Sequence, residues 1–79
     1  MVRERPVTYR DFVRVLAHLG FQQRSSAGGS HEQWVHDGPP FRKVTVDKHH
    51  APFHRTLLKL MLAQAQLSKD RFFSILDRL

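Results

Sequence analysis

Hydrophobic residues recur at helical spacing in the N-terminal part of the chain. Thr8 and Asp11 have the form of a capping box, because the threonine oxygen can accept from the amide three residues later while the aspartate complements the helix dipole. Gly20 supplies a C-terminal stop. The pattern therefore predicts a helix over residues 9–19. Its apolar stripe consists of Tyr9, Phe12, Val13, Leu16 and Leu19.

Two more helices are predicted in the C-terminal third. The first covers residues 55–66, and its core stripe is Leu57, Leu60, Met61 and Ala65. Leu58 and Leu62 lie partly off that stripe, so this helix must contact another element or a partner. Ser68 is the predicted N-cap of a last helix, which we expect to cover Leu58 and Leu62. The alternative is an exposed interaction surface. The predicted buried positions of the last helix are Phe72, Phe73, Ile75, Leu76 and Leu79.

Between these helices the pattern changes to short extended segments. The predicted strands are residues 21–26, 30–36 and 41–47, and the turns between them are Ala27–Gly29 and Asp37–Pro40. Val44 and Val46 share one face of the third strand, as expected for a sheet with one side on a core. The second strand carries an apolar residue on each side, Trp34 and Val35, so its facing stays open. The prediction is an α+β fold in the order α-β-β-β-α-α, with a three-stranded antiparallel sheet packed on helices.

Composition limits the class of protein. The 79 residues allow a single domain, residues 1–79, and 41% hydrophobic with 25% charged residues is ordinary for a globular protein. The absence of cysteine favours a reducing compartment, so we expect a cytoplasmic protein. No apolar run suits a signal peptide or a membrane span. Thirteen Lys and Arg against seven Asp and Glu give a net charge of +6, which favours a polyanionic partner such as nucleic acid.

Several short motifs occur in a family-like order along most of the chain. They are Leu16–Phe21, Gly29–His31, Trp34–Gly38, Lys43–Val46, His49, and the helical pattern Leu57, Leu60, Met61, Ala65, Leu67, Ser68 and Phe72. In this order the sequence resembles the HicA (YcfA-like) family of messenger-RNA interferase toxins. The resemblance implies a fold similar to the double-stranded RNA-binding domain, an endoribonuclease acting on translated messages, and neutralisation by a HicB antitoxin.

The chain departs from the family pattern at two informative positions. Gln66 replaces the glycine that usually follows the second helix, and because a left-handed conformation is strained for glutamine, we expect the helix to run on or to be capped differently. Glu32 replaces a second histidine that often follows His31 in the family. Any contribution from that histidine is therefore missing here.

His31 is the predicted catalytic residue. RNA carries its own nucleophile, the 2′-hydroxyl, so cleavage needs a base, charge stabilisation at the phosphate and a proton for the leaving oxygen, and no cofactor. A histidine side chain suits the base, and the expected products carry a 2′,3′-cyclic phosphate and a 5′-hydroxyl. The source of the second proton stays open between His36, a lysine and water. The structural alternative for His31 is a turn histidine that hydrogen-bonds its own loop.

RNA contacts are predicted around the same strands. Glycine before His31 lets the RNA backbone approach closely, and basic side chains on the sheet and its loops can contact phosphates without reading sequence. The alternative for the cations is a solvated basic face. The predicted RNA-binding residues are Arg24, Gly29, Ser30, Arg42, Lys43 and Lys48. Trp34 could stack on a base, although a single aromatic residue in a mixed strand more often belongs to the core.

Two other hypotheses follow from the sequence. His49, His50 and His54 could bind Zn²⁺, but no fourth ligand is evident and Pro52 interrupts any helix that might align them, so we expect no metal. A non-catalytic RNA-binding module with the same fold is the alternative to the enzyme. The few cations of the penultimate helix, Arg55 and Lys59, argue against docking of that helix on duplex RNA.

Overall fold

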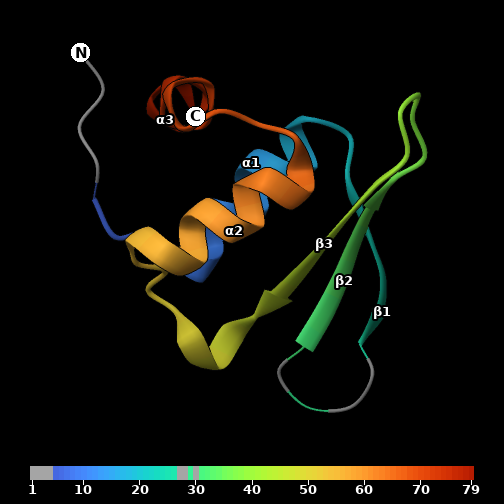
Figure 1. The fold of residues 1–79 in the computed structure, drawn as a ribbon, viewed down its shortest axis with the longest axis horizontal. Coiled ribbons are helices and arrows are strands. Elements are labelled where there is room, and N and C mark those ends of the chain that lie inside the picture. The colour runs from blue at the N-terminus through green and yellow to red at the C-terminus, as the bar shows by residue number, and fades with distance from the viewer. Residues whose placement is uncertain (1–4, 27–28, 30) are drawn as a thin grey trace.

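The predicted α+β architecture is confirmed by a computed structural model, which describes residues 5–26, 29 and 31–79. The elements are α1 (Tyr9–His18), β1 (Gln22–Ser26), β2 (His31–His36), β3 (Arg42–Asp47), a 3-10 turn η1 (Lys48–His50), α2 (Arg55–Ala65) and α3 (Lys69–Arg78). All three helices lie on one side of the sheet (Figure 1). This is the arrangement expected for a fold similar to the double-stranded RNA-binding domain.

The three strands form an antiparallel sheet in the order β1-β2-β3. Directly opposite residues of paired strands point to the same face, and β2 pairs Glu32 with Val46 and Trp34 with Val44. Because Val44 and Val46 are fully buried, Glu32 and Trp34 also face the helices. His31 therefore lies on the opposite, open face of the sheet. This register settles the facing of the second strand.

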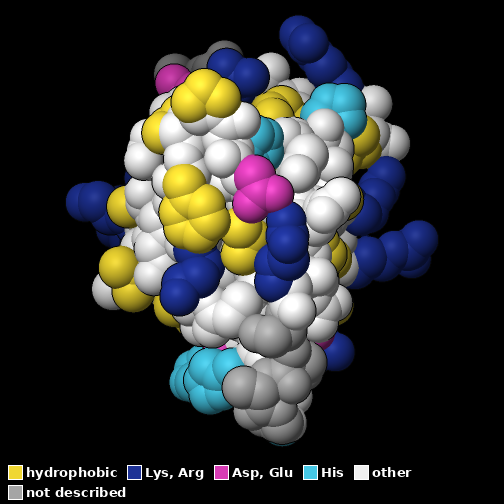
Figure 2. Space-filling model, turned by 90° about the vertical axis from the view of Figure 1, so that its right-hand side faces the viewer, with side chains coloured by type: hydrophobic (Ala, Val, Ile, Leu, Met, Phe, Trp, Pro, Cys, Tyr) yellow, Lys and Arg dark blue, Asp and Glu magenta, His cyan; other side chains and the backbone are white. Residues whose placement is uncertain are grey.

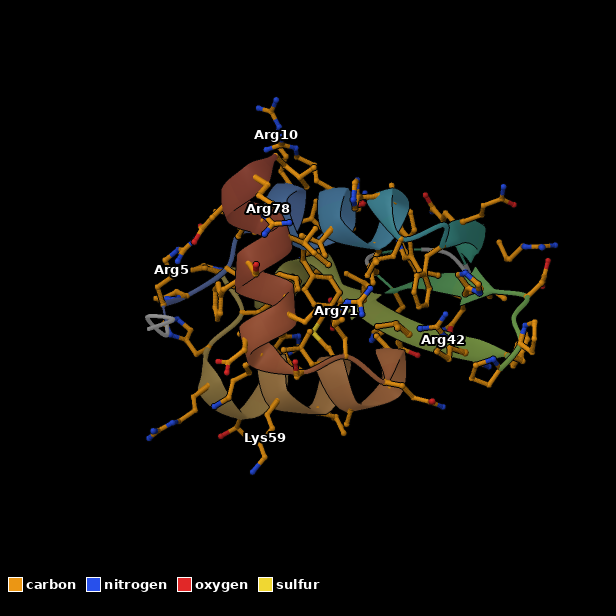
Figure 3. The ribbon with its side chains drawn as sticks, turned by 90° about the horizontal axis from the view of Figure 1, so that it is seen from above. Arg5, Arg10, Arg42, Lys59, Arg71 and Arg78 are labelled. Carbon is orange, nitrogen blue, oxygen red and sulfur yellow. The ribbon has the colours of Figure 1, made fainter. Side chains whose placement is uncertain are left out.

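The core is built around contacting aromatic rings from distant parts of the chain. Phe12 of α1 packs edge-on against Phe53 with ring centroids 5.6 Å apart, and against Phe72 of α3 at 5.5 Å. Leu58 and Leu62 are buried in the same cluster, so the prediction that they pack internally is confirmed. α3 runs across the other two helices and closes this side of the molecule (Figure 3).

Two predicted core positions are wrong. Leu60 is 57% exposed and Leu79 is 43% exposed. The buried stripe of α2 is Leu58, Met61, Leu62 and Ala65, an i, i+3, i+4, i+7 pattern that leaves Leu60 outside it. Leu79 lies one residue beyond the last residue of α3, Arg78, at the C-cap of that helix. In α1 the prediction missed Val15, which is fully buried.

The helix ends explain where the elements begin and stop. Thr8 Oγ1 accepts from the Asp11 amide and Ser68 Oγ from the Arg71 amide, both at 3.1 Å, as the capping motifs predict. Gln66 adopts the left-handed conformation, with φ 56° and ψ 47°, and α2 ends at Ala65. The expectation that the helix would run on or be capped differently is therefore wrong.

A complete Schellman motif stabilises this end of α2. The Gln66 amide donates to Ala63 O at 3.1 Å and the Leu67 amide donates to Leu62 O at 3.0 Å, which satisfies two carbonyls that the helix leaves without partners. Leu67 also packs against the core. These contacts offset the strain of a left-handed glutamine. No helix in the described part of the chain is long and apolar enough to cross a membrane.

Candidate functional site

His31 lies at the start of β2 on the open face of the sheet. Its side chain is 60% exposed, and its Nε2 is 3.2 Å from Oδ2 of Asp47, the residue directly opposite on β3. Gly29, two residues earlier, has a positive φ of 85°, which fits the glycine turn that the sequence predicts. Ser30 lies outside the described residues. His31 is thus held from one side by a carboxylate and open to solvent on the other.

Asp47 connects His31 to a second histidine. Its Oδ2 also contacts His50 Nδ1 at 2.8 Å, while Oδ1 accepts from the His49 amide at 3.0 Å and caps η1. The carboxylate is only 15% exposed, whereas the His50 side chain is 66% exposed. The only role that the sequence suggests for His50 is that of a metal ligand. The signal that could have found it is the spacing Asp47-x-x-His50 directly after a strand, since residues three apart in a helical turn are neighbours.

A groove of about 340 Å³ lies beside this histidine pair. One wall is polar and comes from β2, β3 and η1, and the other wall comes from α2. The lining residues are His31, Thr45, Asp47, His50, Leu57, Leu60, Met61 and Gln64. Gln64 Oε1 accepts from the Thr45 amide at 3.1 Å and so holds α2 against the edge of the sheet. The exposed side chain of Leu60 therefore lines this groove and also contacts solvent.

On the face shown in Figure 2, histidine side chains lie in both the lower and the upper part, and Lys and Arg side chains lie between them and along the edges. Lys43 is exposed, and its pairing with Val35 places it on the same sheet face as His31. Arg24, on β1, forms an ion pair with Asp37. Of the predicted RNA-binding cations, Lys43 is therefore the one that the register aligns with His31.

Arg42 and Lys48 have partners inside the protein. Arg42 lies between the sheet and the C-terminal end of α2 (Figure 3), where Nη1 donates to Ala65 O at 3.2 Å and the guanidinium lies 5.1 Å from the centre of the Phe21 ring. A cation at a helix C-terminus is favourable. Lys48 Nζ is 2.9 Å from Glu32 Oε2. Both side chains therefore have structural contacts that the sequence pattern does not reveal.

Glu32 is the buried polar residue in this part of the fold, 2% exposed. Tyr9 donates its hydroxyl to Oε1 at 2.7 Å and Trp34 donates Nε1–H at 2.9 Å. Burial alone would raise the pKa of Glu32, but hydrogen bonds from Tyr9, Lys48 and Trp34 and the charge of Lys48 outweigh burial and hold that pKa below its usual value. Burial, with the hydrogen bond and charge of Glu32, raises the pKa of Tyr9 to about 12. The network joins α1, β2 and the first residue of η1.

The network also accounts for Trp34. Its ring is partly buried, packs against the core and uses its only donor on Glu32. These contacts favour the core interpretation over stacking on a base.

His36 and His54 occupy other places in the fold. His36 sits about 16 Å further along β2 and on the helix face, where its ring packs edge-on against Phe21 at 5.3 Å and its Nδ1 accepts from the Gly38 amide. His54 precedes α2 as its N-cap. Within residues 5–26, 29 and 31–79, no group of three His, Cys, Asp or Glu side chains is arranged to hold a metal ion.

The comparisons with known proteins agree with the motifs. A family model described as the HicA toxin of bacterial toxin-antitoxin systems matches residues 9–67. Searches among curated proteins and among solved structures find no significant match. The matched range begins at α1, ends just beyond α2 and includes His31, Asp47 and His50. The chain therefore belongs to the HicA family of toxins from bacterial toxin-antitoxin systems.

Proposed function

We propose that this toxin is an endoribonuclease that cleaves messenger RNA, with His31 as the general base. The observation that carries the proposal is the position of His31. Its exposed imidazole lies at the mouth of a groove, and Asp47 contacts the Nε2 of that imidazole. A turn histidine would spend its hydrogen bonds on its own loop, whereas His31 has its described contact on a different strand. Membership of a toxin family supports the same interpretation.

The base chemistry follows from the substrate. The lone pair of the free ring nitrogen of His31 takes the proton of a 2′-hydroxyl, the 2′-oxygen attacks the adjacent phosphorus, and the bond from phosphorus to the 5′-oxygen breaks. The products are a 2′,3′-cyclic phosphate and a 5′-hydroxyl. RNA supplies the nucleophile, so the reaction can proceed on the side chains of the protein alone.

Phosphate contacts come from the face that carries His31. Lys43 lies on that face and Gly29 lies two positions before His31 in the chain, and we propose that they bind the RNA backbone together with Ser30. Arg24 can contribute where its ion pair with Asp37 opens, because exposed pairs of this kind are weak. For Arg42 and Lys48, the internal partners favour a structural role over direct contact with RNA.

An exposed catalytic groove needs an inhibitor in the cell. We propose that a HicB-type antitoxin binds the toxin and blocks cleavage, and that both act in the cytoplasm, where messages are translated. Family membership supports an antitoxin partner.

The test is growth and message integrity in cells that express the wild type, His31→Ala or His18→Ala. His18 is an exposed histidine at the end of α1, so its replacement controls for loss of an imidazole elsewhere. We expect the wild type and His18→Ala to arrest growth and to leave fragments with cyclic phosphate ends, and His31→Ala to do neither. If wild type and His31→Ala are equally harmless while soluble and able to bind RNA, the chain is a binding module. Equal toxicity would place the chemistry away from His31.

A further inference from the structure

His31 and His50 contact the same carboxylate, that of Asp47, and this arrangement suggests a role for His50 as well as for the general base. Resting on the proposed function, we infer that His50 is the general acid that protonates the leaving 5′-oxygen, and that Asp47 is a positioning residue for both imidazoles. His31 Nε2 and His50 Nδ1 lie 3.2 and 2.8 Å from the same oxygen, so the two nitrogens cannot be further apart than these distances together.

The chemistry of the carboxylate determines which ring nitrogens carry hydrogen. An ionised carboxylate only accepts hydrogen bonds, so the nitrogens that face Asp47 are both N–H donors. His31 then presents Nδ1 to solvent, and His50 presents Nε2. A neutral His31 can accept a proton at Nδ1, and a protonated His50 can donate one from Nε2. One carboxylate thus orients a base and an acid at the same time.

The reaction balances with these two groups. His31 Nδ1 removes the 2′-hydroxyl proton as the 2′-oxygen bonds to phosphorus, and His50 Nε2–H transfers its proton to the 5′-oxygen as the bond between phosphorus and that oxygen breaks. After one turnover His31 is protonated and His50 is neutral. Both rings are more than half exposed, so exchange with water restores the starting state.

The other candidate proton donors are less well placed. His36 is on the opposite face of the sheet and about 16 Å along the strand. Lys48 is paired with the buried Glu32. Lys43 lies four residues from Asp47 along β3, about 13 Å away. His50, by contrast, shares a hydrogen-bond partner with His31.

Hydrogen bonding separates His50, whose ring contacts Asp47, from its neighbour His49. His49 follows the same turn and uses its backbone amide on Asp47 Oδ1, a contact that a substitution of its side chain keeps. His49→Ala is therefore a matched control for His50→Ala. Because His50 is largely exposed, its replacement by alanine should leave the fold intact, which circular dichroism can verify.

The experiment uses the leaving group to identify the acid. The bond that the wild type cuts is first mapped in an RNA oligonucleotide, and a second oligonucleotide then carries sulfur in place of the 5′-oxygen at that bond. A thiolate leaves without a proton, since thiols ionise near pH 8.5, about seven units below water. We expect His50→Ala to lower kcat/KM by about 100-fold or more on the oxygen substrate and to cleave the sulfur substrate nearly as well as the wild type.

The other variants make the result decisive. His31→Ala should lose cleavage of both substrates, and His49→Ala should retain both. Equal losses of His50→Ala on the two substrates, or normal cleavage of the oxygen substrate, would overturn the assignment of the acid. A wild type that cleaves neither oligonucleotide nor any longer messenger RNA would instead overturn the proposed function.

The test of Asp47 must distinguish the positioning of the two rings from a purely structural role. Asp47→Asn keeps an oxygen that can cap η1 but replaces the shared acceptor of the two rings. We expect kcat to fall about 10- to 100-fold on both substrates with KM for RNA unchanged, because misplaced rings slow the chemistry and not the binding. Asp47→Glu should restore part of kcat. A rise of KM with an unchanged kcat would overturn the positioning role.

Discussion

Replacing the buried carboxylate of Glu32 tests how the sheet is held against α1 and η1. In Glu32→Gln the side chain keeps one oxygen for Tyr9 and Trp34 but presents an amide to Lys48 in place of the charged acceptor. Hydrogen bonds to a charged group contribute about 1.5–3 kcal/mol, and their neutral counterparts about half as much. Lys48 is 51% exposed and can bind water in place of the carboxylate, so the loss of its ion pair contributes little to the change in stability. We expect the free energy of unfolding to fall by about 1–3 kcal/mol at pH 7.

The pH dependence of that loss identifies its electrostatic origin. The folded-state pKa of Glu32 is lowered, so below the ordinary value of 4.5 the unfolded chain takes up the proton first and the wild type loses stability as the pH falls. Glutamine does not titrate. The difference in unfolding free energy between wild type and Glu32→Gln should therefore be constant from pH 7 to about 5 and shrink below the ordinary pKa of glutamate.

The assay is urea unfolding of both proteins, followed by circular dichroism, at several pH values between 7 and 3. Subtracting one curve from the other removes the contribution of the other six Asp and Glu residues, which both proteins share. Tyr9 remains a donor throughout, since its pKa is raised to about 12. Equal stability at pH 7, or a difference that persists unchanged at pH 3, would refute the account of Glu32 as a stabilised buried anion.

Three further substitutions test the end of α2 and the proposed RNA contacts of the sheet. Gln66→Gly removes the strain of a left-handed non-glycine residue, and the larger backbone entropy of glycine in the unfolded chain offsets part of that gain. We therefore expect the free energy of unfolding, measured by thermal unfolding, to rise by about 0.5–1 kcal/mol without a change in RNA cleavage. A loss of stability would contradict the account of this helix end as a Schellman motif. Lys43→Ala should weaken RNA binding and reduce the slope of log affinity against log salt by about one. Arg42→Ala should lower stability and leave that slope unchanged. Fluorescence titration of RNA at several salt concentrations measures the slope for both variants. A reduced slope for Arg42→Ala and an unchanged slope for Lys43→Ala would contradict the faces that the strand register gives to the two side chains.

Periodicity and capping chemistry predicted the elements because they act over a few residues. Thr8 and Ser68 mark the starts of α1 and α3, and the alternation in β3 identifies Val44 and Val46 as buried. The end of α2 was harder to predict, because the cost of a left-handed Gln66 is local while the contacts that offset it come from the fold. The misplaced Leu60 has a similar origin, since two overlapping leucine stripes on one helix cannot be ranked without knowing where the sheet lies.

The chemistry of the site depended on contacts that single-sequence patterns do not encode. Glu32 looked like a lost histidine, yet its partners Tyr9 and Lys48 lie 23 and 16 positions away along the chain and make it a buried anion. His31 was identified through the motif around it. Its partner Asp47 became evident only when the register of β2 and β3 placed the two residues opposite each other.

The exposure of His31 and the burial of Glu32 are two consequences of one register. Neighbouring residues of a strand point to opposite faces, and a slip of one position would exchange the faces of every side chain in β2. The strand itself gives a weak preference, because it carries apolar residues on both sides. Hydrogen bonds from Tyr9 and Trp34 and the ion pair with Lys48 stabilise only the register in which Glu32 faces the helices. A residue that looks like a departure from the family therefore helps to fix the geometry in which His31 faces the groove.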